Sequence, residues 1–140
     1  MGTLDLIRLL GWITAIIFCL AFSNYFVKVI NKNYINKLGK EKKQFVGNYR
    51  KAMKFIVKNH KLFGIIAFVT MVIHFIVVYS AHLTRLSGIV AALLMIAIVG
   101  LGFYGGFINK NRKGVWLKIH RILPFILLIV IIIHVLFRQN

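Results

Sequence analysis

Four long runs of apolar residues alternate with shorter polar segments along the chain. The runs cover approximately residues 4–30, 62–81, 86–108 and 115–137. Each has about 20 residues or more, the length that an α-helix needs to cross a hydrocarbon core of roughly 30 Å. The pattern predicts an all-α membrane protein in which residues 1–140 form a single domain, a bundle of four transmembrane helices.

Composition and charge agree with this picture and orient it. Apolar residues make up 60% of the chain, and 19 Lys and Arg stand against two acidic residues. Eleven of these cations fall within residues 28–61 and five within 110–121, whereas Arg85 is the only one between the second and third runs. By the positive-inside rule, both basic loops are expected in the cytoplasm and both termini outside. Small size and no recognisable transit peptide favour a bacterial plasma membrane. Anionic lipid accounts for the charge, so no nucleic-acid partner is expected.

The segment before the second run, approximately residues 45–60, has a pattern of its own. Apolar residues recur there at helical spacing, and Arg50, Lys51, Lys54 and Lys58 fall on the other side. This pattern is typical of a basic amphipathic helix that lies on the inner membrane surface and runs into the second span. The alternative is a basic linker whose periodicity arises by chance.

The second and fourth runs repeat each other at an offset of 60 residues. "KNHKLFGIIAFVTMVIH" begins at Lys58 and "KIHRILPFILLIVIIIH" begins at Lys118. Fourteen residues separate the two histidines of each helix, a rise of about 21 Å and nearly four full turns, so both share one face. Both helices are expected to run from inside to outside. His60 and His120 then form one cross-helix pair, and His74 and His134 form another.

Three kinds of chemistry suit a pair of histidines on facing membrane helices: a zinc site, a proton relay and axial ligation of haem iron. Ionisable groups in a membrane usually mark a functional site, and hydrogen-bonded histidines without a cofactor would not explain two equal spacings in register. Zinc takes three or four protein ligands, whereas each pair offers two. A porphyrin supplies four nitrogens and requires two axial ligands, which favours haem. The sequence therefore predicts a four-helix bundle holding two stacked b haems.

The paired histidines, each helix opening its motif with H-[KR]-[LI], resemble the transmembrane dihaem b-type cytochromes. The resemblance is strongest to the ferric reductase and NADPH oxidase-like superfamily and covers the second to fourth runs. Members of that superfamily often carry six spans and a cytosolic flavin and nicotinamide domain. The resemblance implies an electron-transfer cytochrome subunit of an oxidoreductase, here expected to have no nucleotide-binding domain of its own.

Two axial histidines close the coordination sphere of iron, which favours electron transfer over substrate binding. We therefore expect electrons to pass from a cytoplasmic flavoprotein or iron–sulfur subunit, or from a quinol, to an acceptor at the outer face. The alternative is a non-redox protein, either a haem carrier or a membrane anchor and assembly subunit. The sequence leaves open the oligomeric state and the roles of the first run, Cys19 and His82.

Cations beside the histidines are candidates for binding haem propionates. Lys61 and Arg121 directly follow the inner histidines, and Arg85 lies in the outer loop, where the positive-inside rule gives no reason for it. Cations at span ends also extend to the membrane interface without any ligand. Gly64, four residues after His60, would let a flat macrocycle approach the backbone, and Gly102 is expected to serve helix packing.

Overall fold

The computed structural model describes residues 2–109 and 114–137 of the chain. The described residues fold almost entirely into helices, and four of these helices are long and apolar enough to cross a membrane. They are α1 (Thr3–Asn33), α2 (Lys43–Ser80), α3 (Leu86–Phe103) and α4 (Val115–Leu136). Two short 3-10 turns, Ile35–Lys37 and Lys40–Lys42, join α1 to α2, and α3 continues into a π-helical turn, Tyr104–Ile108. The sequence prediction of an all-α protein with four candidate membrane helices is confirmed.

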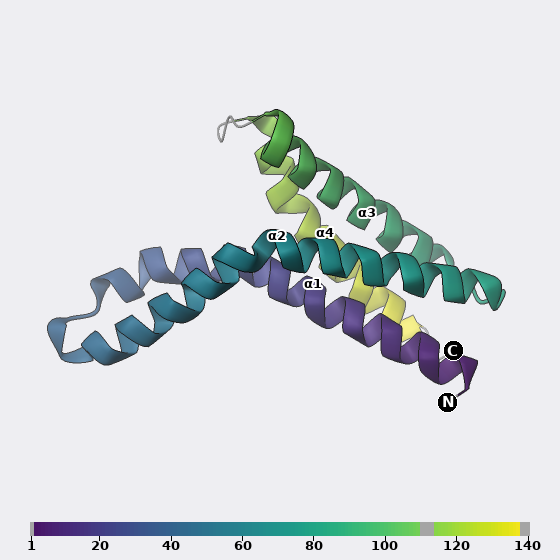
Figure 1. Ribbon diagram of the computed structural model, residues 1–140, viewed down its shortest axis with the longest axis horizontal. Coiled ribbons are helices and arrows are strands. Elements are labelled where there is room, and N and C mark those ends of the chain that lie inside the picture. The colour runs from purple at the N-terminus through teal and green to yellow at the C-terminus, as the bar shows by residue number, and fades with distance from the viewer. Residues whose placement is uncertain (1, 110–113, 138–140) are drawn as a thin grey trace.

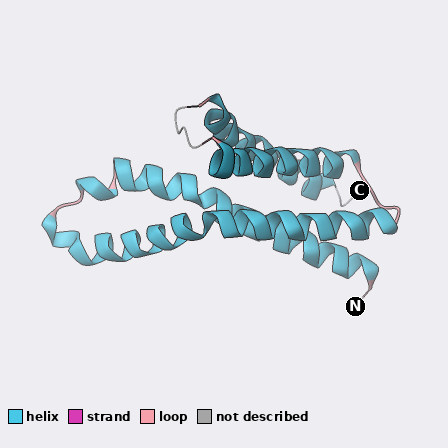
Figure 2. Ribbon diagram, turned by 45° about the horizontal axis from the view of Figure 1, so that its top comes forward, coloured by secondary structure: helices cyan, strands magenta, loops and turns pink. Residues whose placement is uncertain are grey.

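The helices form two antiparallel hairpins, α1–α2 and α3–α4 (Figure 1). Contacts within each hairpin are extensive, and the hairpins touch one another mainly through α2 and α3 and, more weakly, through α1 and α4. Figure 2 shows the hairpins as two separate layers. Both described ends of the chain lie at one end of the molecule, called the termini end below, and α2 and α4 both run toward it.

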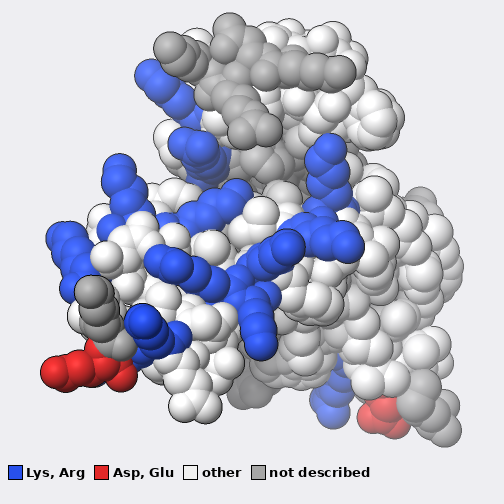
Figure 3. Space-filling model, turned by 60° about the vertical axis from the view of Figure 1, so that its left-hand side comes forward, with Lys and Arg blue, Asp and Glu red and all other residues white. Residues whose placement is uncertain are grey.

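The α1–α2 hairpin extends well beyond α3 and α4 at the opposite end of the molecule (Figure 1). The 38 residues of α2 span about 57 Å, nearly twice the roughly 30 Å of a hydrocarbon core. Two hydrogen bonds hold this extension together: Tyr49 Oη donates to the Val27 carbonyl at 2.8 Å, and Arg50 Nη2 donates to Asn36 Oδ1 at 3.1 Å. Lys and Arg gather over this end, called the basic end below (Figure 3).

The segment 45–60, predicted to be an amphipathic helix running into the second span, is the first half of α2 and continues into the apolar half without a break. It packs along α1 through Tyr49, as described above. The second predicted span therefore begins within a helix that starts at Lys43. That this segment lies on the inner membrane surface stays a prediction.

The centre of the core lies midway between the two levels at which the paired histidines occur. Ala67 of α2 and Leu127 of α4 are each only 1% exposed. They correspond to each other at the offset of 60, and each is seven residues from both histidines of its own helix. Around them pack Phe18 of α1, Met71 of α2, and Met95 and Ile98 of α3. All four helices thus meet in an apolar layer that separates the two histidine levels.

An aromatic cluster joins the two hairpins on one side. Phe125 of α4 meets Phe22 of α1 edge-on, with ring centroids 4.9 Å apart, and also contacts Tyr25 and Phe26. Edge-to-face aromatic pairs contribute about 0.5–1.5 kcal/mol beyond their buried area. In contrast, the described backbones of α2 and α4 hardly approach each other. The two histidine-bearing helices are therefore positioned mainly through α1 and α3.

Candidate functional site: two histidine pairs between the hairpins

His60 of α2 is held by the neighbouring helix of its own hairpin. Its Nδ1 lies 2.9 Å from the carbonyl oxygen of Ala21 in α1. A carbonyl only accepts hydrogen bonds, so the proton of a neutral His60 ring resides on Nδ1, which donates it. This bond fixes the ring orientation and leaves the lone pair of Nε2 for a ligand.

His120 of α4 has the same arrangement within the second hairpin. Its Nδ1 donates to the carbonyl oxygen of Ile98 in α3 at 2.9 Å. The ring also packs on Gly102, where an added methyl group would lie 3.2 Å from Cε1 of His120. A contact of that length is tighter than an ordinary van der Waals contact, so a larger residue at Gly102 would push the ring away.

The structure brings His60 and His120 together across the two hairpins. Their ring centroids lie 6.4 Å apart with an angle of 83° between the planes. Gly64 lies one turn beyond His60 on the same side of α2, and no atom of a neighbouring segment lies within 4 Å of the position that its Cβ would take. The surface of α2 beside His60 is therefore open at Gly64, next to the gap between the His60 and His120 rings.

At the termini end, His74 and His134 pack on glycines of the supporting helices. A methyl group on Gly11 of α1 would lie 3.2 Å from Cε1 of His74, and one on Gly88 of α3 would lie 3.1 Å from Cε1 of His134. Ser87 Oγ lies 2.9 Å from Nδ1 of His134. A hydroxyl both donates and accepts, so this contact orients the ring without fixing which nitrogen carries the proton.

Both histidines of this second pair line one cavity between the hairpins. Arg85 and the two glycines, Gly11 and Gly88, line it as well, and Met71 and Leu127 lie toward its inner end. The guanidinium of Arg85 donates a hydrogen bond to the carbonyl of Phe137 at the end of α4. The structure thus places Arg85 in the lining of the same cavity as His74 and His134, and its binding of a propionate stays a prediction.

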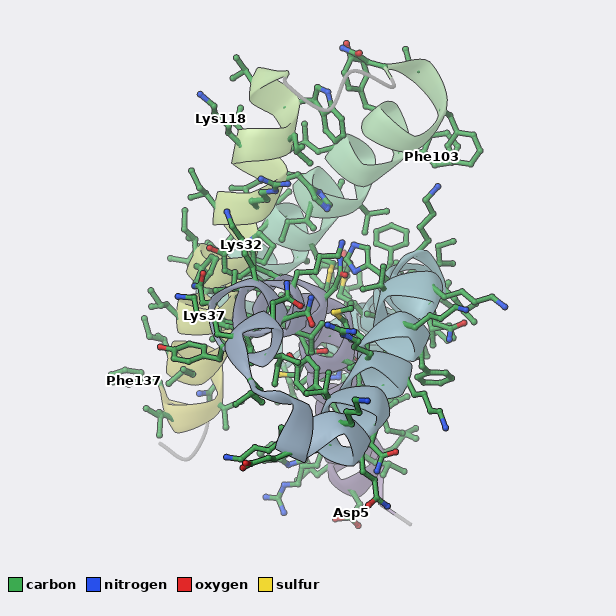
Figure 4. The ribbon with its side chains drawn as sticks, turned by 90° about the vertical axis from the view of Figure 1, so that its left-hand side faces the viewer. Asp5, Lys32, Lys37, Phe103, Lys118 and Phe137 are labelled. Atoms are coloured by element: carbon green, nitrogen blue, oxygen red, sulfur yellow. The ribbon has the colours of Figure 1, made fainter. Side chains whose placement is uncertain are left out.

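Lys61 and Arg121, the other predicted propionate partners, lie next to His60 and His120 and are both exposed. The ammonium of Lys61 lies 5.8 Å from the centroid of the Phe107 ring, across the gap to the second hairpin. At the start of α4, Lys118 points away from the bundle (Figure 4). Their binding of propionates stays a prediction.

His82 lies in the turn between α2 and α3, outside both pairs. It is exposed and has φ = 55°, a left-handed conformation that histidine adopts more readily than most residues. His82 is therefore a surface residue of this turn. Cys19, the cysteine of α1, is exposed on the outside of the bundle.

Sequence reasoning missed the contribution of the first helix. The Ala21 carbonyl and Gly11 show that α1 orients both histidines of α2, just as α3 orients those of α4 through Ile98 and Gly88. A backbone carbonyl has no sequence signature. The sequence signal available for this role was Gly11 near the start of α1 and Gly88 near the start of α3, at the level where α2 and α4 end with His74 and His134.

Among the described residues, no three side chains of His, Cys, Asp or Glu gather closely enough to hold a metal ion. Zinc normally takes three or four protein ligands. The two histidine pairs are therefore better matched to a centre that brings its own equatorial ligands. Comparison with known proteins adds no assignment, because no family model, curated protein or solved structure matches the chain.

Proposed function

We propose that the protein transfers electrons across a membrane through two b haems. Each haem would be held by one histidine of α2 and one of α4, His60 with His120 and His74 with His134. When bound between two histidines, haem would supply reversible one-electron oxidation and reduction. The residues of the chain bind and orient the two groups and keep them apart by the apolar layer around Leu127.

The observation that carries this proposal is the geometry of the His60–His120 pair. An imidazole nitrogen binds a metal such as zinc at about 2.05 Å. A five-membered ring with bonds of about 1.33 Å has its nitrogens roughly 1.1 Å from the centroid. Two imidazoles on opposite sides of one metal ion therefore have centroids about 6.3 Å apart, close to the 6.4 Å between these rings.

The hydrogen bonds of the two rings support the same assignment. Metal-bound histidines usually donate their second ring nitrogen to a carbonyl, carboxylate or water, which fixes the tautomer and raises ligand basicity. His60 and His120 both donate Nδ1–H to backbone carbonyls, of Ala21 and Ile98 respectively. Two histidines that hydrogen-bonded only to each other would place a ring nitrogen of one against the other ring, whereas the Nδ1–H groups of both rings bond to carbonyls outside the pair.

The two levels suggest a path and a direction. Fourteen residues of helix separate the pairs by about 21 Å, so one haem would lie near each membrane surface. With the basic end in the cytoplasm, an interior-negative potential favours outward electron movement by about 2.3 kcal/mol per 100 mV for a full crossing. The donor would be a flavoprotein or iron–sulfur subunit docking at the basic end, or a quinol, and the acceptor would lie outside.

The deciding experiment is a dithionite-reduced minus oxidised visible spectrum of the purified full-length protein, with haem quantified by the pyridine haemochrome assay. We expect two b haems per chain, with low-spin spectra that are reversible on reoxidation. Substoichiometric haem that is lost on dilution would instead indicate a haem carrier. Absence of haem after expression with ample haem supply would indicate an anchor or assembly subunit and overturn the proposal.

The direction of transfer depends on membrane orientation, which can be tested separately. Single cysteines placed at Glu41 and at Asp5, in a Cys19→Ser background, should react differently with a membrane-impermeant thiol reagent in intact cells. We expect position 5 to be labelled in intact cells and position 41 to be labelled only after lysis, because the basic end is expected on the cytoplasmic side. Labelling of position 41 in intact cells would reverse the proposed direction of electron flow.

A further inference from the structure

The supporting helices α1 and α3 also repeat each other, at an offset of 77 residues. The segment "LIRLLG" at residues 6–11 matches "LTRLSG" at residues 83–88, in the pattern L-x-R-L-x-G. Together with the offset of 60 between α2 and α4, this second repeat makes the α1–α2 hairpin the counterpart of the α3–α4 hairpin.

The contacts of the two supporting helices follow the same offset. Gly11 packs on His74 as Gly88 packs on His134, with nearly equal distances. The carbonyl of Ala21 binds His60 as the carbonyl of Ile98 binds His120. Phe18 and Met95, which also differ by 77, both belong to the core. These matched contacts relate the two hairpins by an approximate twofold exchange of α1 with α3 and of α2 with α4.

The repeat assigns a counterpart to Arg85, the arginine beside the termini-end pair. Arg8 and Arg85 each precede their histidine-contacting glycine by three residues toward the termini end, Arg8 within the first turns of α1 and Arg85 immediately before α3. Arg85 lines the cavity that contains His74 and His134. Both arginines are exposed, and Arg8 lies three residues before Gly11, a glycine that lines the same cavity.

We propose that Arg8 and Arg85 form a pair of carboxylate-binding sites that receive the two propionates of the termini-end haem, one on each side. The proposal rests on the proposed function. Haem b carries both propionates on one edge, and the twofold axis that exchanges its two faces also exchanges these two carboxylates. The same symmetry relates the two hairpins and therefore relates the two arginines.

The basic end offers an internal parallel. Lys61 and Arg121 differ by 60 residues, each directly follows a histidine of the His60–His120 pair, and both are exposed. Lys61 and Arg121 thus form a matched pair of cations, one from each ligand helix, and Lys28 of α1 also lies near His60. At the termini end, Arg8 and Arg85 form a matched pair from the two supporting segments. The positive-inside rule predicts few cations on the outer side, where the sequence places only Arg8, Arg85 and Arg138.

The test is an optical redox titration of the full-length protein and of Arg8→Gln, Arg85→Gln, Arg8→Lys and the double Arg-to-Gln variant. Loss of a positive charge beside a haem disfavours the reduced, more negative form. We expect Arg8→Gln and Arg85→Gln to lower the midpoint potential of the same haem component by similar amounts, with a larger shift in the double variant. Arg8→Lys should retain most of the wild-type potential, since it keeps the charge.

Arg50→Gln is the matched control, because it removes a guanidinium group from the part of α2 at the basic end, far from the His74–His134 pair. It should leave this component unchanged. A titration in which Arg85→Gln shifts the potential and Arg8→Gln does not would overturn the pairing while leaving the haem assignment intact. A purified protein with no haem spectrum would overturn the proposed function and this pairing with it.

Discussion

Replacing His120 with leucine should halve the haem content and leave one low-spin b haem per chain. The substitution removes one axial ligand from the basic-end pair and also its bond to the Ile98 carbonyl, whereas His74 and His134 lie about 21 Å away. His60→Leu should remove the same component, because the two rings face one another. Haem per chain and the reduced-minus-oxidised spectrum measure the loss.

The pairing across hairpins is what this series tests. His74→Leu and His134→Leu should both remove the other component, and combining His60→Leu with His120→Leu should cost no more haem than either change alone. His82→Asn is the control, since His82 lies in an exposed turn and asparagine also tolerates its left-handed conformation. Loss of one component in His60→Leu and of the other in His120→Leu would contradict the pairing.

Gly102→Val should weaken the basic-end haem without touching either of its ligands. The added side chain would meet the His120 ring, because even a single methyl group would lie 3.2 Å from Cε1. Overpacking of this kind typically costs about 1–3 kcal/mol, which corresponds to roughly 5- to 150-fold in affinity. Titration of the haem-depleted protein with haem would measure the change.

Gly100→Val provides a matched control on the same helix, two residues away. Near Gly100, no atom of a neighbouring segment lies within 4 Å of the position that its Cβ would take, so the larger side chain enters open space. It should retain wild-type affinity, and both variants should retain the helical circular dichroism of the parent. Equal weakening by the two substitutions would attribute the effect to α3 as a whole and argue against the contact with His120.

Four apolar runs sufficed to predict the four long helices, because length and hydropathy alone distinguish a membrane-spanning helix. The second run, about residues 62–81, was expected to follow directly on an amphipathic helix over about residues 45–60, and α2 contains both segments as one helix from Lys43 to Ser80. The sequence changes from basic to apolar near His60, which alters the surroundings of the helix but not its backbone hydrogen bonds. Because no proline interrupts residues 43–80, the helix continues through this point.

The histidine repeat predicted which side chains face one another, and the structure brings His60 and His120 into contact. What holds them could not be predicted in the same way. The acceptor for His60 is the carbonyl of Ala21, which any residue type would supply, and its position depends on how α1 packs along α2. The roles of Gly11 and Gly88 could not be predicted from the sequence, because only the antiparallel packing of the helices places Gly11 against His74 and Gly88 against His134.

The weak contact between the two hairpins bears on how the protein is made. Each hairpin contributes one histidine to each level, so a single hairpin offers only half of either site. Each hairpin also packs far more closely within itself than against the other. Each hairpin would therefore insert into the membrane before the two hairpins dock. A haem ligated by one histidine from each hairpin would then hold the docked hairpins together. A ligand that binds only the docked form stabilises it by mass action, so haem supply would set how much of the newly synthesised chain reaches its final, closed arrangement.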